Sequence, residues 1–153
     1  MTTAATILIV EDGDEYLENL SRFVPGPRYL QAKGGRAALS LLESEPIDLI
    51  YLDMRFDRLA PGELLGDLDA LLARSGNRKK ALGTLANHQG LYILEALRDA
   101  GYGGLPVILA YDFGAEPERF ARLAERHARL TWMPDAVGPG EIRARIERLL
   151  QRG

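Results

Sequence analysis

Apolar residues along the chain follow two spacings, short continuous runs and helical repeats. The runs are rich in leucine and β-branched residues, the composition of strands covered on both faces of a parallel sheet. Such runs predict strands at 6–10, 29–32, 47–52, 103–110 and 130–133. Each run is followed by apolar residues three or four positions apart, which is typical of amphipathic helices. These repeats predict helices at 14–24, 35–43, 91–101, 116–128 and 139–149.

Five strands that each lead into a helix imply a doubly wound α/β fold. Right-handed crossovers place the helices on both faces of a parallel sheet. The common order for five such strands is 2-1-3-4-5, the flavodoxin-like order, in which the first and third strands are neighbours. A length of 153 residues suits one hydrophobic core. We therefore expect a single domain over residues 1–153.

The stretch between the third strand and the helix at 91 is too long for a structureless loop in a compact domain. Pro61 opens an apolar stripe and Gly76 closes it, which predicts one helix between them. The stripe consists of Leu64, Leu65, Leu68, Leu71 and Leu72. A shorter helix is expected over 78–87. We predict a helical insertion at about 56–89 that serves as a lid, a docking or dimerisation surface, or simple packing.

Three acidic residues stand directly after two strands that the expected order makes neighbours. Glu11 and Asp12 follow the first strand, and Asp53 follows the third. Ligands of open α/β sheets bind at this edge, so the three carboxylates are expected to converge. Close carboxylates repel one another unless they bind protons or a cation, and Mg²⁺ prefers oxygen ligands. The alternative is that these acids solvate loops or cap the first helix, as Asp12 or Asp14 would.

Composition narrows the classes of partner. The formal net charge is −3 and the pI about 5.5, so general attraction to nucleic acid is not expected. The absence of cysteine excludes disulfides and thiolate metal sites. The apolar runs are too short to span a bilayer, and residues 1–6 lack the features of a signal peptide. We expect a cytoplasmic protein without a membrane segment.

Four segments together resemble the receiver domain of two-component response regulators. They are ILIVED at 7–12, DLIYLD at 48–53, the helix that begins at Gly90, and LPVI at 105–108. The resemblance implies signal transduction in a phosphorelay, in which Asp53 accepts a phosphoryl group from a histidine kinase or phosphotransfer protein. It also implies Mg²⁺ held by Glu11, Asp12, Asp53 and the backbone carbonyl of Arg55. We expect a stand-alone receiver that is not an enzyme beyond self-phosphorylation and acts by binding an unknown downstream protein.

Two residues that receivers use to sense the phosphoryl group are missing. The family carries a Ser or Thr at the end of the fourth strand, but no hydroxyl of either type lies between Thr84 and Thr131. The family also carries a lysine before the proline after the fifth strand, where this chain has Met133. Tyr111 or Arg55 would have to compensate. The further candidate pocket residues are Met133, Tyr111 and His88.

Other functions fit parts of the same pattern. A pseudo-receiver scaffold would work without phosphorylation and would need neither missing residue. A Mg²⁺-dependent phosphohydrolase needs a second aspartate two residues after Asp53, where Arg55 stands. A flavin or nucleotide binder would need a glycine-rich, less acidic first loop. A second candidate contact region is the basic face of helix 116–128, formed by Arg119, Arg122, Arg126 and Arg129.

Overall fold

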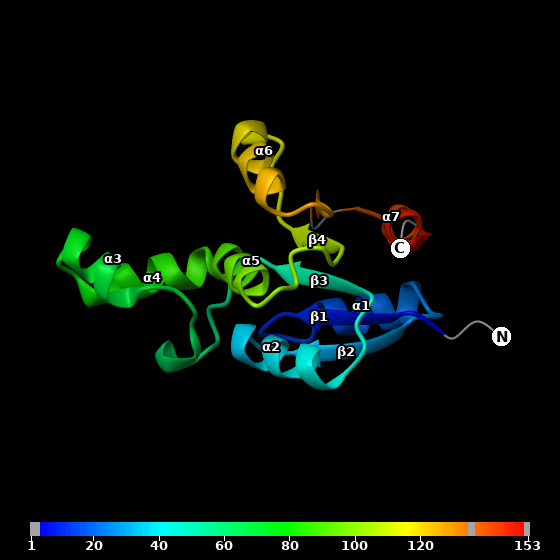
Figure 1. The fold of residues 1–153 in the computed structure, drawn as a ribbon, viewed down its shortest axis with the longest axis horizontal. Helices are drawn as coiled ribbons and strands as arrows, with labels where there is room; N and C mark the ends of the chain where they lie inside the picture. Colours follow the sequence, from blue (N-terminus) through cyan, green and yellow to red (C-terminus); the bar gives the residue numbers. More distant parts are fainter. Residues whose placement is uncertain (1–3, 135–136, 152–153) are drawn as a thin grey trace.

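The strands form one parallel sheet in the order β2-β1-β3-β4-β5, as the sequence predicts. The computed structural model describes residues 4–134 and 137–151, so the outermost residues of the expected domain lie outside it. The strands are β1 (Thr6–Val10), β2 (Arg28–Ala32), β3 (Leu49–Asp53), β4 (Val107–Ala110) and β5 (Leu130–Met133). Figure 1 shows them between layers of helices.

Helices cover both faces of the sheet. They are α1 (Glu15–Phe23), α2 (Gly35–Ser44), α5 (Gln89–Asp99), α6 (Pro117–Arg126) and α7 (Pro139–Gln151). Alternate residues of β1 face opposite ways, so Ile7 packs with Leu20 of α1 and Ile146 of α7. Leu8 belongs to the other core cluster, with Ile93 of α5. Every residue of β1 is buried, as expected of a central parallel strand. Among the described residues no helix has the length and apolar character to cross a membrane.

Two predicted strands are shorter than the sequence suggested. The third strand begins at Leu49 rather than 47, because the Asp48 carboxylate accepts a hydrogen bond from the Thr6 backbone N–H at 2.8 Å. The fourth begins at Val107 rather than 103. A turn that closes α5 uses the preceding backbone, with the Tyr102 N–H donating to the Leu97 carbonyl at 2.8 Å.

The predicted continuous helix from Pro61 to Gly76 is wrong. A 3₁₀ turn, η1 (Pro61–Glu63), and a separate helix, α3 (Leu68–Ser75), flank an extended break. Gly66 in the break has φ +115°, a conformation that favours glycine. Asp67 then caps α3, accepting a hydrogen bond from the Ala70 N–H at 3.0 Å. The leucines before and after the break therefore do not form one helical stripe.

The second inserted helix is confirmed as α4 (Arg78–Asn87). It packs along α3, and the two helices form a hairpin that extends away from the sheet (Figure 1, green). Asn77 caps α4 by accepting a hydrogen bond from the Lys80 N–H at 3.1 Å. Ala81 and Leu85 are buried, whereas no residue of α3 is. The base of the hairpin is therefore integrated into the fold and its tip is exposed.

A buried glutamine joins the insertion to the body of the protein. The Gln89 side chain is fully buried and accepts a hydrogen bond from the Leu65 N–H at 2.7 Å. Its amide nitrogen donates to the carbonyls of Leu65 and Leu85, each at 3.0 Å. These bonds satisfy the backbone of Leu65 outside any helix. They explain why the apolar stripe breaks at this point.

Gly90 allows α5 to approach the end of β3. Its N–H donates to the Met54 carbonyl at 2.9 Å. A Cβ at this position would lie 2.6 Å from the Asp53 carbonyl oxygen and 2.9 Å from the Met54 Cα. Only glycine fits so close to another backbone, so Gly90 fixes the course of the chain immediately after Asp53.

Replacing Gln89 tests its role as the junction. Gln89→Leu is expected to lower the free energy of unfolding by about 2–4 kcal/mol, because it leaves buried backbone groups of Leu65 and Leu85 without partners. Urea unfolding followed by circular dichroism measures the loss. Asn87→Leu, on the neighbouring exposed position, is the control and is expected to change stability by less than about 0.5 kcal/mol. Equal effects of the two substitutions would contradict the assignment.

Candidate functional site

The three carboxylates predicted to converge line one hollow at the carboxyl edge of the sheet. Its volume is about 390 Å³. The lining residues are Glu11, Asp12, Glu15, Tyr16, Asn19, Asp53, Arg55, Asp57 and Arg58. The pairing of β1 with β3 brings the acids together, because Val10 and Leu52 are register partners and the acids follow them. We call this space the acidic hollow.

Glu11 is directed into the fold and caps α1. Its side chain is only 1% exposed. One carboxylate oxygen accepts from the Tyr16 N–H at 3.1 Å, and the other accepts from the Leu17 N–H at 2.9 Å and from Gln31 Nε2 at 3.2 Å. Burial raises the pKa of Glu11, although these hydrogen bonds oppose the rise. The expectation that Asp12 or Asp14 caps α1 is wrong, because neither side chain bonds to its first turn.

A backbone N–H and two cationic side chains hold the other acids of the loop after β1. Asp12 accepts a hydrogen bond from the Arg58 backbone N–H at 2.7 Å. The Arg58 guanidinium pairs with Glu15 at 2.9 Å and keeps the pKa of Glu15 below its usual value. Lys33 pairs with Asp14 at 2.6 Å, which lowers the pKa of Asp14. No pattern in the sequence pointed to Arg58 or Lys33, because isolated charges in loops are ordinarily solvated.

Asp53 is the last residue of β3, opposite Ala110 of β4. Its side chain is half-buried, and one of its oxygens accepts a hydrogen bond from the Met54 N–H at 2.8 Å. The neighbouring Arg55 is exposed and lines the acidic hollow. Asp53 and Arg55 therefore lie where the sequence placed them, at the edge next to Asp12.

The further candidate pocket residues lie elsewhere, and none of them lines the acidic hollow. Met133 is buried in the core among residues such as Ile108. The Tyr111 hydroxyl donates to Glu116 at 2.7 Å, which directs it toward the start of α6. His88 lies at the junction of α4 and α5, with its Nδ1 3.4 Å from Arg119. A sequence cannot reveal such side-chain directions.

These polar residues form a chain of contacts from β4 to the insertion. Glu116 bonds both Tyr111 and Arg119, the latter at 3.0 Å. Arginine can only donate, so a hydrogen bond between Arg119 and His88 requires the Nδ1 of His88 to be the acceptor. Burial, and then the positive charges of Arg119 and Arg55, lower the pKa of His88. The network links α6 to the insertion rather than to the acidic hollow.

The carboxylates as they lie do not fit a magnesium ion. Mg²⁺ requires oxygen ligands in near-octahedral geometry. Both carboxylate oxygens of Glu11 accept hydrogen bonds within the protein, and one oxygen of Asp12 accepts a hydrogen bond from the Arg58 backbone N–H. Within residues 4–134 and 137–151, no group of three or more His, Asp or Glu side chains is arranged to hold a metal ion. Magnesium binding therefore stays a prediction that this arrangement does not favour.

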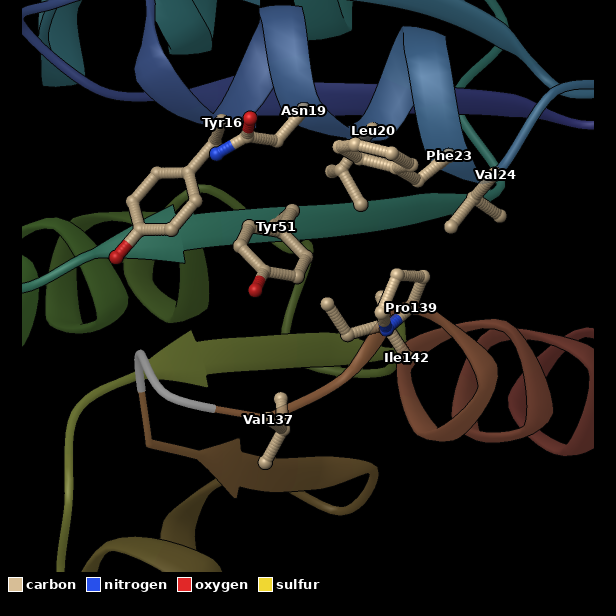
Figure 2. A pocket seen from close by; sticks show the side chains of 9 residues that line it. All are labelled: Tyr16, Asn19, Leu20, Phe23, Val24, Tyr51, Val137, Pro139 and Ile142. Atoms are coloured by element: carbon tan, nitrogen blue, oxygen red, sulfur yellow. The ribbon is translucent and has the colours of Figure 1, made fainter.

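A second hollow lies beside the acidic one, between α1 and α7. Figure 2 shows its lining, with Tyr51 of β3 between the two helices. Its volume is about 210 Å³ and its walls are mainly apolar. Phe23, at its rim, is 44% exposed. Tyr16 and Asn19 line both hollows, so the apolar and the acidic surfaces are continuous along α1.

Comparison of the sequence with known protein families and with curated proteins finds no match. Solved structures share the fold. Chemotaxis protein CheY4 of Vibrio cholerae has a TM-score of 0.64 at 16% identity, over 97% of this chain and 100% of that chain. The receiver domain of the Francisella response regulator 1452 has a TM-score of 0.63 at 16% identity, covering 97% and 98%. NtrX of Brucella abortus has a TM-score of 0.65 at 18% identity, and 27% of its length is covered.

The sheet order and these similarities define the class of fold. The chain has the flavodoxin-like fold of response-regulator receiver domains, as the four sequence segments indicated. The similarity extends over nearly the whole chain, whereas the chain spans about a quarter of the longer protein NtrX. The acidic hollow lies at the crevice where such sheets bind their ligands.

Removing the Glu11 carboxylate tests whether it supports the fold. Glu11→Ala is expected to lower the free energy of unfolding by about 2 kcal/mol, because two N–H groups of α1 lose their acceptor. Urea unfolding with a chelator present measures this loss. Asp57→Ala removes an exposed carboxylate from the same hollow and is expected to leave stability unchanged. If Glu11 served only as a crowded acid, its removal would relieve repulsion and stabilise the protein.

Proposed function

We propose that this chain is a receiver-type signalling protein that acts by binding other proteins and does not depend on phosphorylation of Asp53. The observation that carries the proposal is the state of the two acids beside Asp53. Glu11 caps α1 and Asp12 holds the loop after β3, so both have structural partners. Proteins of this fold named as response regulators and chemotaxis proteins support the signalling role.

Phosphoryl transfer needs positive charge on the transferring oxygens, which a metal ion and cationic side chains supply. At the ends of β4 and β5 this chain offers Ala110 and Met133, which are register partners. Neither side chain carries a hydroxyl or a charge. The ends of β4 and β5 therefore provide none of the stabilisation that a phosphoryl group would need.

The second candidate function is a receiver that is phosphorylated at Asp53. One observation favours it: Asp53 lines the same hollow as Asp12 and Arg55. In that case Mg²⁺ bound at the hollow would neutralise charge near Asp53, and a histidine kinase or phosphotransfer protein would be the donor. The two candidates differ in whether the intact protein binds a phosphoryl mimic.

Beryllofluoride with Mg²⁺ tests the first proposal directly. We expect no shift in the melting temperature of the purified protein and no bound fluoride signal by ¹⁹F NMR, because the acids beside Asp53 are engaged. Incubation with acetyl phosphate is expected to leave the intact mass unchanged. Asp53→Ala is the control. A fluoride signal or added phosphoryl mass that disappears in Asp53→Ala would replace the proposal with the phosphorylated form.

The α3–α4 hairpin is the surface that we propose for protein binding. None of the residues that line the acidic hollow comes from either helix, although Asp57 and Arg58 at the start of the insertion do line it. The ends of α3 and α4 that meet at this turn carry four exposed cations, and none of them forms an ion pair within the described chain. They are Arg74, Arg78, Lys79 and Lys80. A projecting basic tip on a protein of net negative charge suits an acidic protein surface.

Charge reversal at the tip tests this surface. The triple variant Arg78→Glu, Lys79→Glu, Lys80→Glu is expected to weaken binding to a co-purified partner by at least about tenfold, because like charges then face the partner's acids. The melting temperature is expected to stay within about 2 °C of the parent. Arg122→Glu on α6, the second candidate contact region, is the control in the same binding assay. If only Arg122→Glu loses binding, the contact surface lies on α6 and not on the hairpin.

A further inference from the structure

Arg58 lies at the rim of the acidic hollow and is attached there at two points. Its backbone N–H donates to Asp12 at 2.7 Å. Its guanidinium donates to Glu15 at 2.9 Å. Gly13 lies directly beneath this ion pair, because a Cβ at that position would overlap both the guanidinium and the Glu15 carboxylate. Arg58 thus spans the loop after β1.

We infer that Arg58 is a resident cation of the acidic hollow, where its guanidinium offsets part of the negative charge of the carboxylates and competes with a divalent metal ion. This inference rests on the proposed function and gives it a physical cause. Clustered carboxylates must be neutralised by protons or a cation. Five carboxylates and two arginines line the hollow, and Arg58 offsets part of this negative charge without a metal ion.

The segment after β3 is built to deliver Arg58 to this position. Phe56 is fully buried, and its N–H donates to the Ala86 carbonyl of α4 at 2.9 Å. Leu59 packs against Gly34 at the start of α2, with its Cδ1 2.8 Å from the position that a Cβ of that residue would take. Anchors on both sides therefore fix residues 57 and 58 at the rim of the hollow.

Lys33 completes the neutralisation of the same loop from its other side. Its ammonium donates to the Gly13 carbonyl at 2.9 Å and to Asp14 at 2.6 Å. Gln31 also donates to the Gly13 carbonyl, at 2.8 Å. The loop after β1 is thus held on one side by Gln31 of β2 and by Lys33, which follows β2, and on the other side by Arg58. Each acid from Glu11 to Glu15 has a partner from the chain itself.

Exclusion of a metal follows from charge and from ligand supply. A guanidinium within the hollow repels a dication that approaches Asp12 or Asp53. Asp12 has also committed one oxygen to the Arg58 N–H. Removing only the guanidinium leaves this backbone bond and all the carboxylates in place. Replacement of the side chain is therefore expected to strengthen Mg²⁺ binding relative to the parent.

Magnesium binding by Arg58→Gln, followed by isothermal titration calorimetry and by the melting temperature, tests the inference. We expect the parent protein to show no Mg²⁺-dependent rise in melting temperature. Arg58→Gln is expected to bind Mg²⁺ at least about tenfold more tightly than the parent, because the competing charge is gone. The gain is expected to disappear when Asp53→Ala is added. Arg55→Gln removes the same charge from the same hollow without breaking a described bond, and is expected to behave as the parent.

The outcomes separate this inference from the proposed function. Specific Mg²⁺ and beryllofluoride binding by the parent would overturn both. No Mg²⁺ binding by either the parent or Arg58→Gln would overturn the role of Arg58 and leave the proposed function standing. Equal gains in Arg58→Gln and Arg55→Gln would assign the effect to general charge and overturn the inference. If Arg58→Gln folds only with Mg²⁺ the inference is supported, and if it stays unfolded at every Mg²⁺ concentration it is overturned.

Discussion

The parallel pairing of β1 with β3 is the constraint on which the rest of the structure depends. It buries both central strands and makes their carboxyl ends neighbours, so Glu11, Asp12 and Asp53 must share one edge. Acids held together in this way need partners. The chain supplies them from the first turn of α1, from β2 and from the segment after β3, so the acidic edge organises the loops around it.

The inserted segment is part of this organisation as well as an addition to it. Its first residues deliver Arg58 to the acidic hollow, and Gln89 ties its base to α5. The hairpin beyond that base extends from the body and exposes a basic tip. The inserted segment therefore joins two parts of the protein. One is the edge of the sheet at which receivers react, and the other is a surface suited to protein contact. The two parts are joined by Phe56, whose backbone N–H is hydrogen-bonded to Ala86 of α4.

Much of the fold was predictable, because strands buried on both faces and helices with one apolar face have distinct spacings. The prediction failed within 61–76, where a continuous leucine pattern hides a break. Leu65 satisfies its backbone with the Gln89 side chain, a contact across 24 positions of the sequence. Local periodicity carries no information about such a bond. The same reason explains the capping of α1 by Glu11 rather than by the acids nearer the helix.

The sequence by itself determined the sheet order, the edge at which the acids meet, and the absence of the hydroxyl and lysine that receivers use. These follow from local composition and from the handedness of crossovers. Only the tertiary structure decided what the acids do. Whether a carboxylate faces a hollow, a helix terminus or an arginine depends on side-chain direction and on residues distant in sequence. Arg58 is an example, because it can pair with Glu15 only when β1 and β3 lie side by side.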